Sequence, residues 1–352
     1  MGAQTKQVTT ADIARYTGLS KMTVSRVLNN HPYVSVRTRE RVLEAVSKLG
    51  FRPNTLARRF FTGKTRLIGL IIPLKYMLSS YYFKEVFEGV RECLEQHDYD
   101  ILLHDSTTQS VAPHDKCLDL VKGRLAEGLL ISAPMDYDVY PSLLAKEDVP
   151  LVVIGETASG PGVNRVGIPN RQGAEQAVRQ LIHAGHRRIA MLTFGQNHLE
   201  GRERWMGYLD ALKQTGIPAD PALVVEARYN RLAAQEETRR LLAAHPDLTA
   251  IMAANSDMAL GAVDAIRSLG LRIPGDISLV AFDDCAEMEL NDPPITAIRQ
   301  FPGKVGNAAA HLLLDILEGR SSIHDATCRL IDVEYISRQS IAPPSAQRNK
   351  HD

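Results

Sequence analysis

The sequence lacks the short motifs that mark most hydrolases, metal proteins and nucleotide-binding enzymes. It has no His-Glu-x-x-His, Gly-x-Ser-x-Gly or Cys-x-x-Cys segment, and its 11 histidines show no metal-ligand spacing. The segment Gly63-Lys64-Thr65 imitates the end of a P-loop, but Arg58 stands where that motif needs a glycine. We therefore expect no enzyme, no cofactor and no bound metal.

Long apolar runs and paired cysteines are also missing. The longest apolar run, around 67–74, is far shorter than the ~20 residues of a membrane-spanning helix. The first twenty residues contain no apolar signal segment and include Lys6, Asp12 and Arg15. The 4 cysteines stand alone, as is typical of reduced thiols in the cytoplasm. We expect a cytoplasmic protein that makes no contact with membranes.

Acidic residues are scarce at the amino end. Residues 1–66 hold 13 Lys or Arg and only Asp12, Glu40 and Glu44, whereas the remainder holds 28 basic and 38 acidic residues. A basic segment gains affinity for phosphates through counterion release, and an acidic remainder discourages indiscriminate binding. This division indicates a small DNA-binding head on an acidic body.

Two short amphipathic segments around the Gly18 turn predict a helix-turn-helix. The side chains expected to face inward are Ile13, Ala14, Thr17, Val24, Val27 and Leu28. Ser20 stands where an N-cap is needed. The outward side chains are then Lys21, Met22, Ser25 and Arg26. The first turn of a recognition helix reaches base edges in the major groove, and Arg26 one turn later can reach a guanine or a phosphate. The alternative is a solvated face on an ordinary helical hairpin.

A third helix is predicted from the cap Ser35 through 36–49 to the stop at Gly50. Its expected inward side chains are Val42, Leu43, Val46 and Leu49. The basic segment 51–63 follows, with Pro53 at a helix start, and is too short to be stable as a helix alone.

Residues 8–65 resemble the headpiece and hinge of the LacI/GalR family of bacterial transcriptional repressors. The resemblance is carried by Thr-Val-Ser-Arg-Val-Leu-Asn at 23–29 and Arg-Pro-Asn-x-x-Ala-Arg at 52–58. It implies that 54–60 form a hinge helix only when two subunits occupy an operator, with Phe60 replacing the family's usual leucine wedge in the minor groove. Phenylalanine can also serve as such a wedge; packing against the body is the alternative. The residues expected to contact DNA are Thr9, Ser20, Lys21, Met22, Thr23, Ser25, Arg26, Asn29, Asn54, Ala57, Arg58 and Phe60.

From Leu67 onward, short apolar runs alternate with helical stretches. The predicted strands are 67–72, 100–103, 128–131, 150–154, 188–192, 250–253 and 277–282, and predicted helices include 173–184, 201–214 and 258–269. Such alternation predicts parallel sheets with helices on both faces, and the length favours two lobes. The segment 296–319, helical after Pro302, is expected to return to the first sheet before 327–336 adds a last strand.

This body resembles the periplasmic-binding-protein-like body of the same family. The expected fold class is therefore α/β: a small all-α helix-turn-helix headpiece plus a two-lobed body with parallel sheets. The expected divisions are a headpiece 1–50, a hinge helix and linker 51–65, an effector-binding and dimerisation domain 66–341, and a flexible tail 342–352. Within the domain, lobe 1 is expected at about 66–165 and 296–325, and lobe 2 at about 166–295 and 326–341.

Ligands of open parallel sheets bind beyond the carboxyl ends of the strands, so we expect an effector between the lobes. The resemblance implies effector contacts by Tyr82, Arg204, Tyr229, Asn255 and Asp283. For Asn255 the alternative is a helix cap, and for the tyrosines it is packing. Such a set suits a polyhydroxylated ligand, because Arg and Asp can each hold neighbouring hydroxyls. The chain departs from the family at Asn255-Ser256, usually Asn-Asp, and at Pro169, where an acid is usual.

Together these features predict a sequence-specific transcriptional regulator, a repressor of a carbohydrate operon that binds a palindromic operator as a homodimer. A sugar or sugar acid would switch it; a corepressor-dependent regulator sensing a nucleobase or another metabolite is the alternative. The tail has no leucine heptads for a tetramerisation helix. Two other classes of protein remain open. One is a sugar-binding protein or degenerate enzyme with the same body, and the other is an architectural DNA-bending protein.

Overall fold

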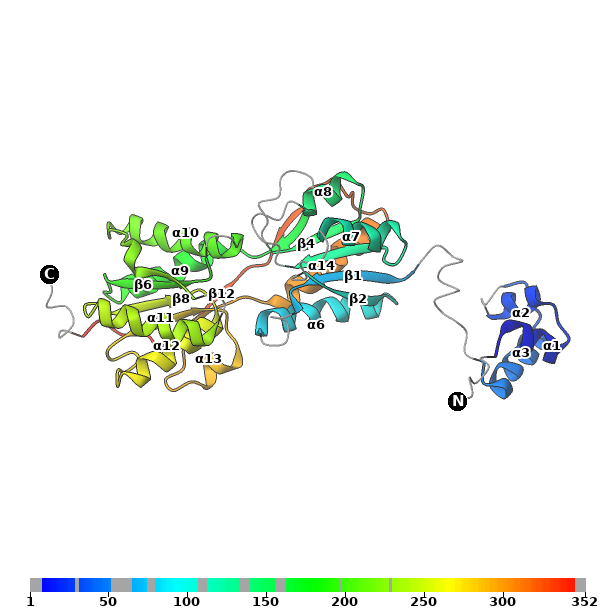
Figure 1. The fold of residues 1–352 in the computed structure, drawn as a ribbon, viewed down its shortest axis with the longest axis horizontal. Helices are drawn as coiled ribbons and strands as arrows, with labels where there is room; N and C mark the ends of the chain where they lie inside the picture. The colour runs from blue at the N-terminus through cyan, green and yellow to red at the C-terminus, as the bar shows by residue number, and fades with distance from the viewer. Residues whose placement is uncertain are drawn as a thin grey trace. The chain divides into compact units, whose positions relative to one another are not determined.

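The computed structural model describes residues 8–28, 32–51, 65–74, 80–106, 113–132, 140–155, 163–195, 198–227 and 230–345. The chain divides into two compact units, Met1–Thr65 and Arg66–Asp352 (Figure 1). None of the helices in these ranges is long and apolar enough to cross a membrane.

In the described residues of the first unit there are three helices, α1 (Thr10–Thr17), α2 (Lys21–Leu28) and α3 (Val36–Leu49). Local chemistry sets their ends. The Asp12 carboxylate accepts the backbone N–H of Thr9 at 3.0 Å, and Ser35 Oγ accepts the N–H of Thr38 at 3.3 Å. Gly18 and Gly50 close α1 and α3 in the left-handed region, at φ 62° and 63°. The predicted cap and bounds of the third helix are confirmed.

The three helices share one apolar core. It consists of Ile13, Ala14, Val24, Val27, Val42, Ala45 and Phe51, with Val8, Leu19, Leu28, Val34, Val46 and Leu49 packed around it. One predicted core position is wrong: Leu43 is 50% exposed, and Ala45 is fully buried instead. Leu43 and Ala45 lie on opposite sides of Val42 around the helix, so helical periodicity permits either of them to face inward. The small Ala45 side chain lets α3 approach the other two helices closely.

The described strands of the second unit form two six-stranded sheets, one in each of two lobes. The first sheet has the order β11-β5-β4-β3-β1-β2, and the second has the order β12-β10-β9-β8-β6-β7. The strands of the first are β1 (Leu67–Ile72), β2 (Asp100–Asp105), β3 (Gly128–Ser132), β4 (Leu151–Ile154), β5 (Asn164–Gly167) and β11 (Cys328–Leu330). Those of the second are β6 (Ile189–Thr193), β7 (Val224–Glu226), β8 (Ala250–Ala253), β9 (Ser278–Phe282), β10 (Thr296–Arg299) and β12 (Glu334–Ile336). All neighbours are parallel except β10 and β12. The predicted α/β class with two parallel-sheet lobes is confirmed.

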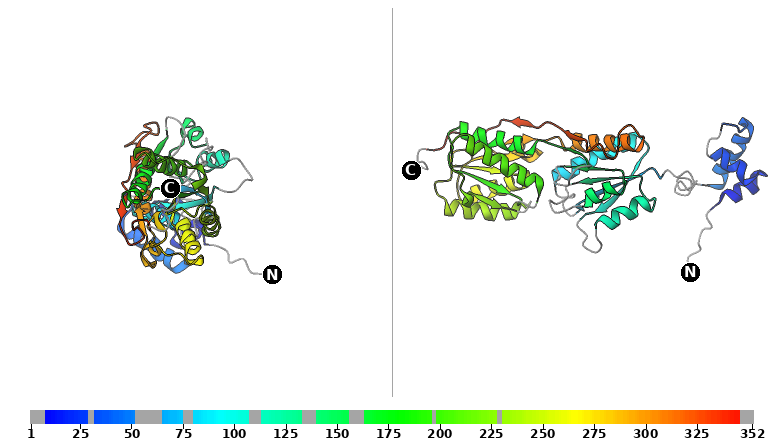
Figure 2. Two further views of the ribbon diagram at one scale, coloured as in Figure 1. Left: turned by 90° about the vertical axis from the view of Figure 1, so that its left-hand side faces the viewer. Right: turned by 90° about the horizontal axis from the view of Figure 1, so that it is seen from above.

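Helices cover both faces of each sheet (Figure 2). In the first lobe α6 (Tyr81–Gln96) packs on α14 (Pro302–Leu317), and α7 (Pro113–Lys122) packs on α8 (Tyr140–Lys146). In the second lobe α9 (Asn170–His183) packs on α10 (Leu199–Gln214), and α11 (Arg231–Ala244) packs on α12 (Ser256–Ser268). The short helices η1 (Pro221–Leu223) and α13 (Ala286–Leu290) complete the described elements of this lobe. With both faces covered, the strands are buried, which explains their nearly continuous apolar runs.

The chain crosses between the lobes at other residues than the sequence suggested. The segment 296–299, expected in the first lobe, forms β10 and pairs with β9 of the second sheet. The single last strand expected within 327–336 is two short strands, β11 in the first sheet and β12 in the second. Because these strands are only three or four residues long and mix polar with apolar residues, their sequence does not show which of the two sheets they join.

Helix α10 approaches α9 closely because residue 207 is glycine. A Cβ at Gly207 would lie 2.1 Å from the backbone oxygen of Arg171 and 2.9 Å from the backbone nitrogen of Glu175. The contact brings the start of α9, with Asn170, beside Arg204 in α10.

Candidate nucleic-acid interface and effector site

Helix α2 presents a short polar face at the start of its first turn. Ser20 Oγ accepts the backbone N–H of Thr23 at 3.1 Å and lies 2.9 Å from the Thr23 hydroxyl. The side chain therefore caps α2, as the sequence predicted, and fixes the direction in which the first turn points.

The side chains expected to read DNA lie on the solvent side of α2. Lys21, Met22, Ser25 and Arg26 are exposed, and Met22 is 66% exposed even though it is apolar. Thr23 is half-buried beside the cap. Thr9 is also exposed, and its hydroxyl donates to Asp12 at 2.7 Å. An exposed methionine next to two cations is the arrangement expected of a surface that packs on base edges.

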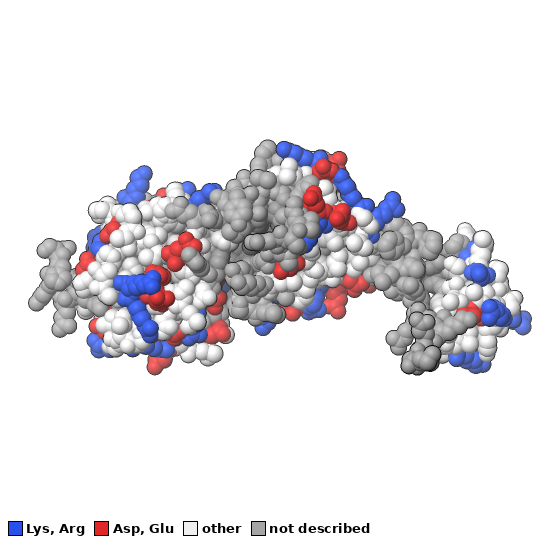
Figure 3. Space-filling view, viewed as in Figure 1, with Lys and Arg blue, Asp and Glu red and all other residues white. Residues whose placement is uncertain are grey.

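On the face of the first unit that Figure 3 shows, Lys and Arg side chains are more prominent than Asp and Glu side chains. Arg15 pairs with Asp12 at 3.3 Å and Lys48 with Glu44 at 2.8 Å, both within one helix. Lys21 and Arg26 form no ion pair with any residue that the structure describes. Their charges are therefore available to phosphates or bases. Asn29, Asn54, Ala57, Arg58 and Phe60, also expected at DNA, lie outside the described residues.

In the second lobe, buried polar groups gather where β8, β9 and β10 end. Asp283 and Gln300 directly follow β9 and β10, Asn255 lies two residues after β8, and each is at most 7% exposed. Arg204 in α10 and Asn170 in α9 join them and are equally buried. We call these five residues the Arg204 cluster. Buried polar groups are costly unless hydrogen-bonded, so their concentration at one edge of the sheet indicates a binding site.

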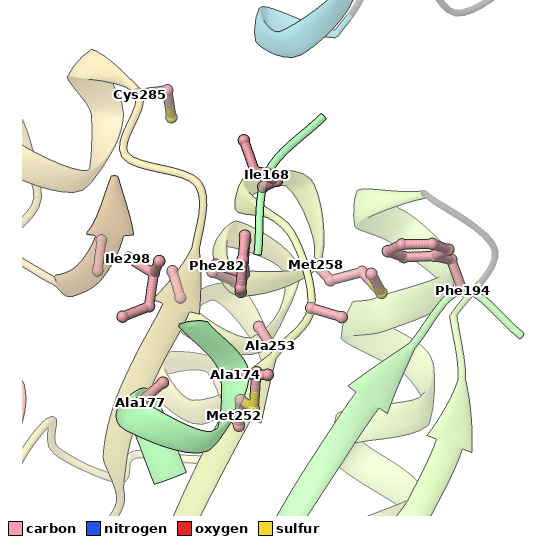
Figure 4. Packing of buried hydrophobic residues seen from close by; sticks show 14 of the residues in the cluster. Ile168, Ala174, Ala177, Phe194, Met252, Ala253, Met258, Phe282, Cys285 and Ile298 are labelled. Atoms are coloured by element: carbon pink, nitrogen blue, oxygen red, sulfur yellow. The ribbon is translucent and has the colours of Figure 1, made fainter. Parts of the chain in front are cut away.

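Arg204 is held by three neighbours. Its Nε donates to Asn170 Oδ1 at 2.8 Å, and its Nη1 donates to the backbone oxygen of Ala254 at 2.5 Å. The guanidinium stacks on Phe282, 3.8 Å from the ring centroid. Phe282 is packed in the apolar cluster of this lobe with Ile298 and Met258 (Figure 4). The guanidinium of Arg204 is therefore fixed in one orientation by groups from α9, from β9 and from the residue after β8.

Asp283 follows β9 with a backbone φ of 76°, a strained conformation for a residue other than glycine. Its carboxylate accepts the side-chain N–H of Gln300 and lies 3.9 Å from Arg204 Nη1. Burial raises the pKa of Asp283, while Arg204, Gln300 and the backbone N–H of Ser256 oppose that rise. The carboxyl group of Asp283 thus lies between Gln300 and Arg204.

Asn255 acts as a helix cap, the alternative that the sequence left open. Its Oδ1 accepts the backbone N–H of Met258 at 2.8 Å, at the start of α12. Its amide nitrogen and the second lone pair of Oδ1 are the groups that a ligand could contact.

Asp284, which follows Asp283, has a different role. Its carboxylate accepts a hydrogen bond from Arg338 Nη1 at 2.6 Å, and Arg299 Nη2 lies 2.7 Å from the same carboxylate. The two arginines come from the segment after β12 and from β10, so the paired charges fix the last crossing of the chain to the second lobe. Asp284 therefore stabilises the fold by holding these two segments together.

Tyr82 comes from the first lobe, on α6. Its ring packs edge-on against Phe83 at 5.3 Å, and Phe83 is buried in the core. Burial raises the pKa of Tyr82 above its ordinary value, the Glu200 and Asp283 carboxylates raise it further, and Arg204 opposes them. The hydroxyl therefore lies in the field of the Arg204 cluster. Tyr229, the other expected aromatic contact, lies outside the described residues.

Sequence reasoning missed Asn170, Glu200 and Gln300 as members or neighbours of this site. Asn170 was noted only for the proline before it. Gln300 directly follows a strand of the second sheet, and Glu200 precedes Arg204 by one helical turn; these placements are the signals that could have identified them.

Comparison with known proteins agrees with this arrangement. Residues 9–54 match the family described as bacterial regulatory proteins, lacI family, and residues 178–341 match the periplasmic binding protein-like domain. The transcriptional regulator CelR of Thermobifida fusca is 32% identical over 88% of this chain and 92% of its own length. Catabolite control protein A of Priestia megaterium is 31% identical over 87% of this chain and 91% of its own.

Two solved structures are similar over nearly the whole chain. A lac repressor dimer bound to operator and the anti-inducer ONPF has a TM-score of 0.85 at 27% identity, covering 96% of this chain and 100% of that one. A complex of the transcriptional regulator CelR with cellobiose has a TM-score of 0.73 at 29% identity, covering 95% and 100%.

A helix-turn-helix unit joined to a two-lobed body defines the class: the protein is a DNA-binding transcriptional regulator. It belongs to the lacI family of bacterial regulatory proteins. Its relatives are regulators and not enzymes, in agreement with the sequence.

Proposed function

We propose that the protein is a repressor of a carbohydrate operon that binds a palindromic operator as a homodimer and is switched by a small ligand at the Arg204 cluster. The observation that carries this proposal is the buried Arg204–Asp283 pair, at 3.9 Å, at the strand ends of one lobe, with Tyr82 of the other lobe in its field. A ligand touching both lobes would favour one of their arrangements.

The DNA half of the proposal rests on α2. Lys21, Met22 and Arg26 are exposed on one side of a capped helix, while Val24 and Val27 are buried on the other. In this role Lys21 and Met22 contact base edges, and Arg26 contacts a guanine or a phosphate. The lac repressor dimer bound to operator supports the same mode of binding here.

The ligand half rests on the chemistry of the cluster. A guanidinium, a carboxylate and three amides around an aromatic ring suit neighbouring hydroxyl groups. The CelR complex with cellobiose supports a sugar. Ligand binding would change DNA affinity only through its different affinities for the two lobe arrangements.

The proposed divisions are a headpiece 1–50, a linker 51–65, an effector-binding and dimerisation domain 66–341 and a tail 342–352, acting in the cytoplasm and at the nucleoid. The lobe boundaries are revised so that β10 belongs to lobe 2 and β11 to lobe 1, while α14 stays in lobe 1 and β12 in lobe 2.

Selection of bound duplexes from a random pool, followed by footprinting, tests this function. The full chain should select a short palindrome and protect it as a dimer. Protection of DNA without sequence preference would contradict the proposal and favour an architectural protein.

A further inference from the structure

We infer that Met22 selects a thymine in each half-site of the operator by packing against the C5-methyl group of that base in the major groove. This inference rests on the proposed operator binding and deepens it, because it names the base and the atom that one side chain recognises. The sequence assigned Met22 only to base edges in general.

Met22 is held on the side of α2 that faces away from the core. Successive residues of an α-helix are about 100° apart, so Met22 and Val24 point in nearly opposite directions, whereas Met22 and Arg26 differ by about 40°. Val24 is fully buried and Met22 is 66% exposed. Ser20 caps the helix through the backbone N–H of Thr23, which fixes the first turn. Met22 therefore cannot turn into the core while Val24 stays there.

The charged groups beside Met22 on this face of α2 are cations. Lys21 and Arg26 are exposed, α2 has no acidic residue, and neither cation forms an ion pair with a residue that the structure describes. DNA phosphates line both sides of the major groove and attract these two cations, which places the apolar side chain between them against the base edges. The chemistry of those edges then decides which base Met22 accepts.

A methionine side chain gains from contact with only one of the groups that bases present in the major groove. It has no hydrogen-bond donor, and its thioether sulfur is a weak acceptor. Guanine, adenine and cytosine present hydrogen-bonding groups at this edge, whereas thymine also presents its apolar methyl group. Packing Met22 on a polar edge would remove water without replacing its hydrogen bonds, whereas packing it on the methyl group buries apolar surface. A T·A pair is therefore the base pair that Met22 favours.

The size of a methyl group sets the expected effect. Burying one group of this size changes an affinity by about fourfold. A palindrome offers the contact twice, once to each subunit, so removing the methyl group from both half-sites should weaken binding by about fifteenfold if the two contacts are independent. Such a change leaves every hydrogen bond of the base pair in place.

Replacement of thymine by deoxyuridine tests the inference, because uracil lacks only the methyl group. Each thymine of the selected operator is replaced in turn, in both half-sites, and the affinity of the full chain is measured by anisotropy. We expect at least one position where uracil weakens wild-type binding by about fivefold to fifteenfold. At that position Met22→Ala should bind the thymine and uracil operators equally well. In a C·G operator variant at the same position, 5-methylcytosine should bind the wild type more tightly than cytosine does.

Leu43→Ala is the matched control variant. It also removes an exposed apolar side chain from the first unit, but from α3, where Leu43 is 50% exposed. It should keep the wild-type loss of affinity for the uracil operator. The comparison of thymine with uracil in the wild-type protein depends on no variant.

If uracil weakens wild-type binding at no thymine position, the inference is overturned. A loss that persists unchanged in Met22→Ala also overturns it, because another side chain then contacts the methyl group. In both cases the selected operator leaves the proposed regulator function standing. If no sequence is selected from the random pool, the proposed function is wrong, and this inference is wrong with it.

Discussion

The guanidinium of Arg204 stacks on the ring of Phe282, with 3.8 Å between its central carbon and the ring centroid. Arg204 comes from α10 and Phe282 from the end of β9, so the contact joins a surface helix to the central sheet of the second lobe. Stacking fixes the plane of the guanidinium, and hydrogen bonds to Asn170 and Ala254 fix its rotation in that plane. The proposed effector site is therefore held in place by contacts within the protein itself.

Replacing Arg204 with lysine should destabilise the protein as well as remove the ligand response. An ammonium cannot stack as a plane or donate in both directions, so Asn170 Oδ1 and the oxygen of Ala254 would lose their donors. Each buried oxygen left unpaired costs about 1 to 3 kcal/mol. Urea denaturation measures this loss. Arg171→Lys is the control, because the Arg171 pair with Asp210 is exposed and should contribute less than about 1 kcal/mol. Equal stability of the two variants would contradict the structural role of Arg204.

Replacing Asp284 with asparagine should also lower the free energy of unfolding. The change leaves Arg299 and Arg338 without the carboxylate between them, and loss of one partner of a buried pair costs about 3 to 5 kcal/mol. Asp264→Asn breaks the exposed pair with Arg231 and is the matched comparison. If Asp284→Asn lowers the free energy of unfolding no more than Asp264→Asn does, the ion pairs of Asp284 with Arg299 and Arg338 contribute little to stability.

Replacing Arg26 with alanine should weaken binding to the selected operator by about 1 to 3 kcal/mol and relax the preference at one base position of each half-site. If Arg26 contacts only phosphate, the loss would instead be uniform across sequences. Arg15→Ala removes an exposed arginine from α1 that is paired with Asp12, and it should change neither quantity. Competition between operator variants, measured by anisotropy, separates these outcomes.

Stability should fall as the pH is lowered from about 6.5 toward 4. Burial lowers the pKa of His198 from 6.5 to about 4 and also lowers those of His186 and His104. The unfolded chain therefore takes up protons on these histidines at a pH where the folded chain does not, and stability present above pH 6.5 is lost on acidification. Asp283 and Asp257 act in the opposite direction, because burial raises their pKa values.

His198→Asn isolates one part of this dependence. Each pKa unit corresponds to about 1.4 kcal/mol, so the variant should lose less stability than the wild type between pH 7 and pH 5, measured by urea denaturation. His183 is exposed, and His183→Asn should keep the wild-type difference. The same pH dependence in all three proteins would rule out the contribution of His198.

What the sequence predicted well is what depends on neighbours along the chain. The Ser20 and Ser35 caps, the inward Val24 and Val27, and the strands around 67–72 and 250–253 follow from local periodicity and capping. Leu43 was wrongly placed in the core because periodicity alone does not decide which side of Val42 packs inward.

What the sequence did not predict depends on contacts between distant segments. Arg204 meets Asn170 across 34 positions, and Gln300 meets Asp283 only because β10 joins β9 in the second sheet. Three-residue strands such as β11 and β12 carry too little pattern to assign to a sheet. Such placements are set by tertiary packing, which no window of the sequence contains.

The most direct test of a ligand-switched operator-binding protein is the coupling between the two binding events. Operator affinity is measured by anisotropy with and without a saturating concentration of a sugar that binds the protein, and ligand affinity is measured by calorimetry with and without operator. We expect the two affinities to change by the same factor, about 5- to 150-fold, as linkage requires, and we expect the change to vanish in Asp283→Ala. Operator affinity that stays constant at saturating ligand would contradict the switch.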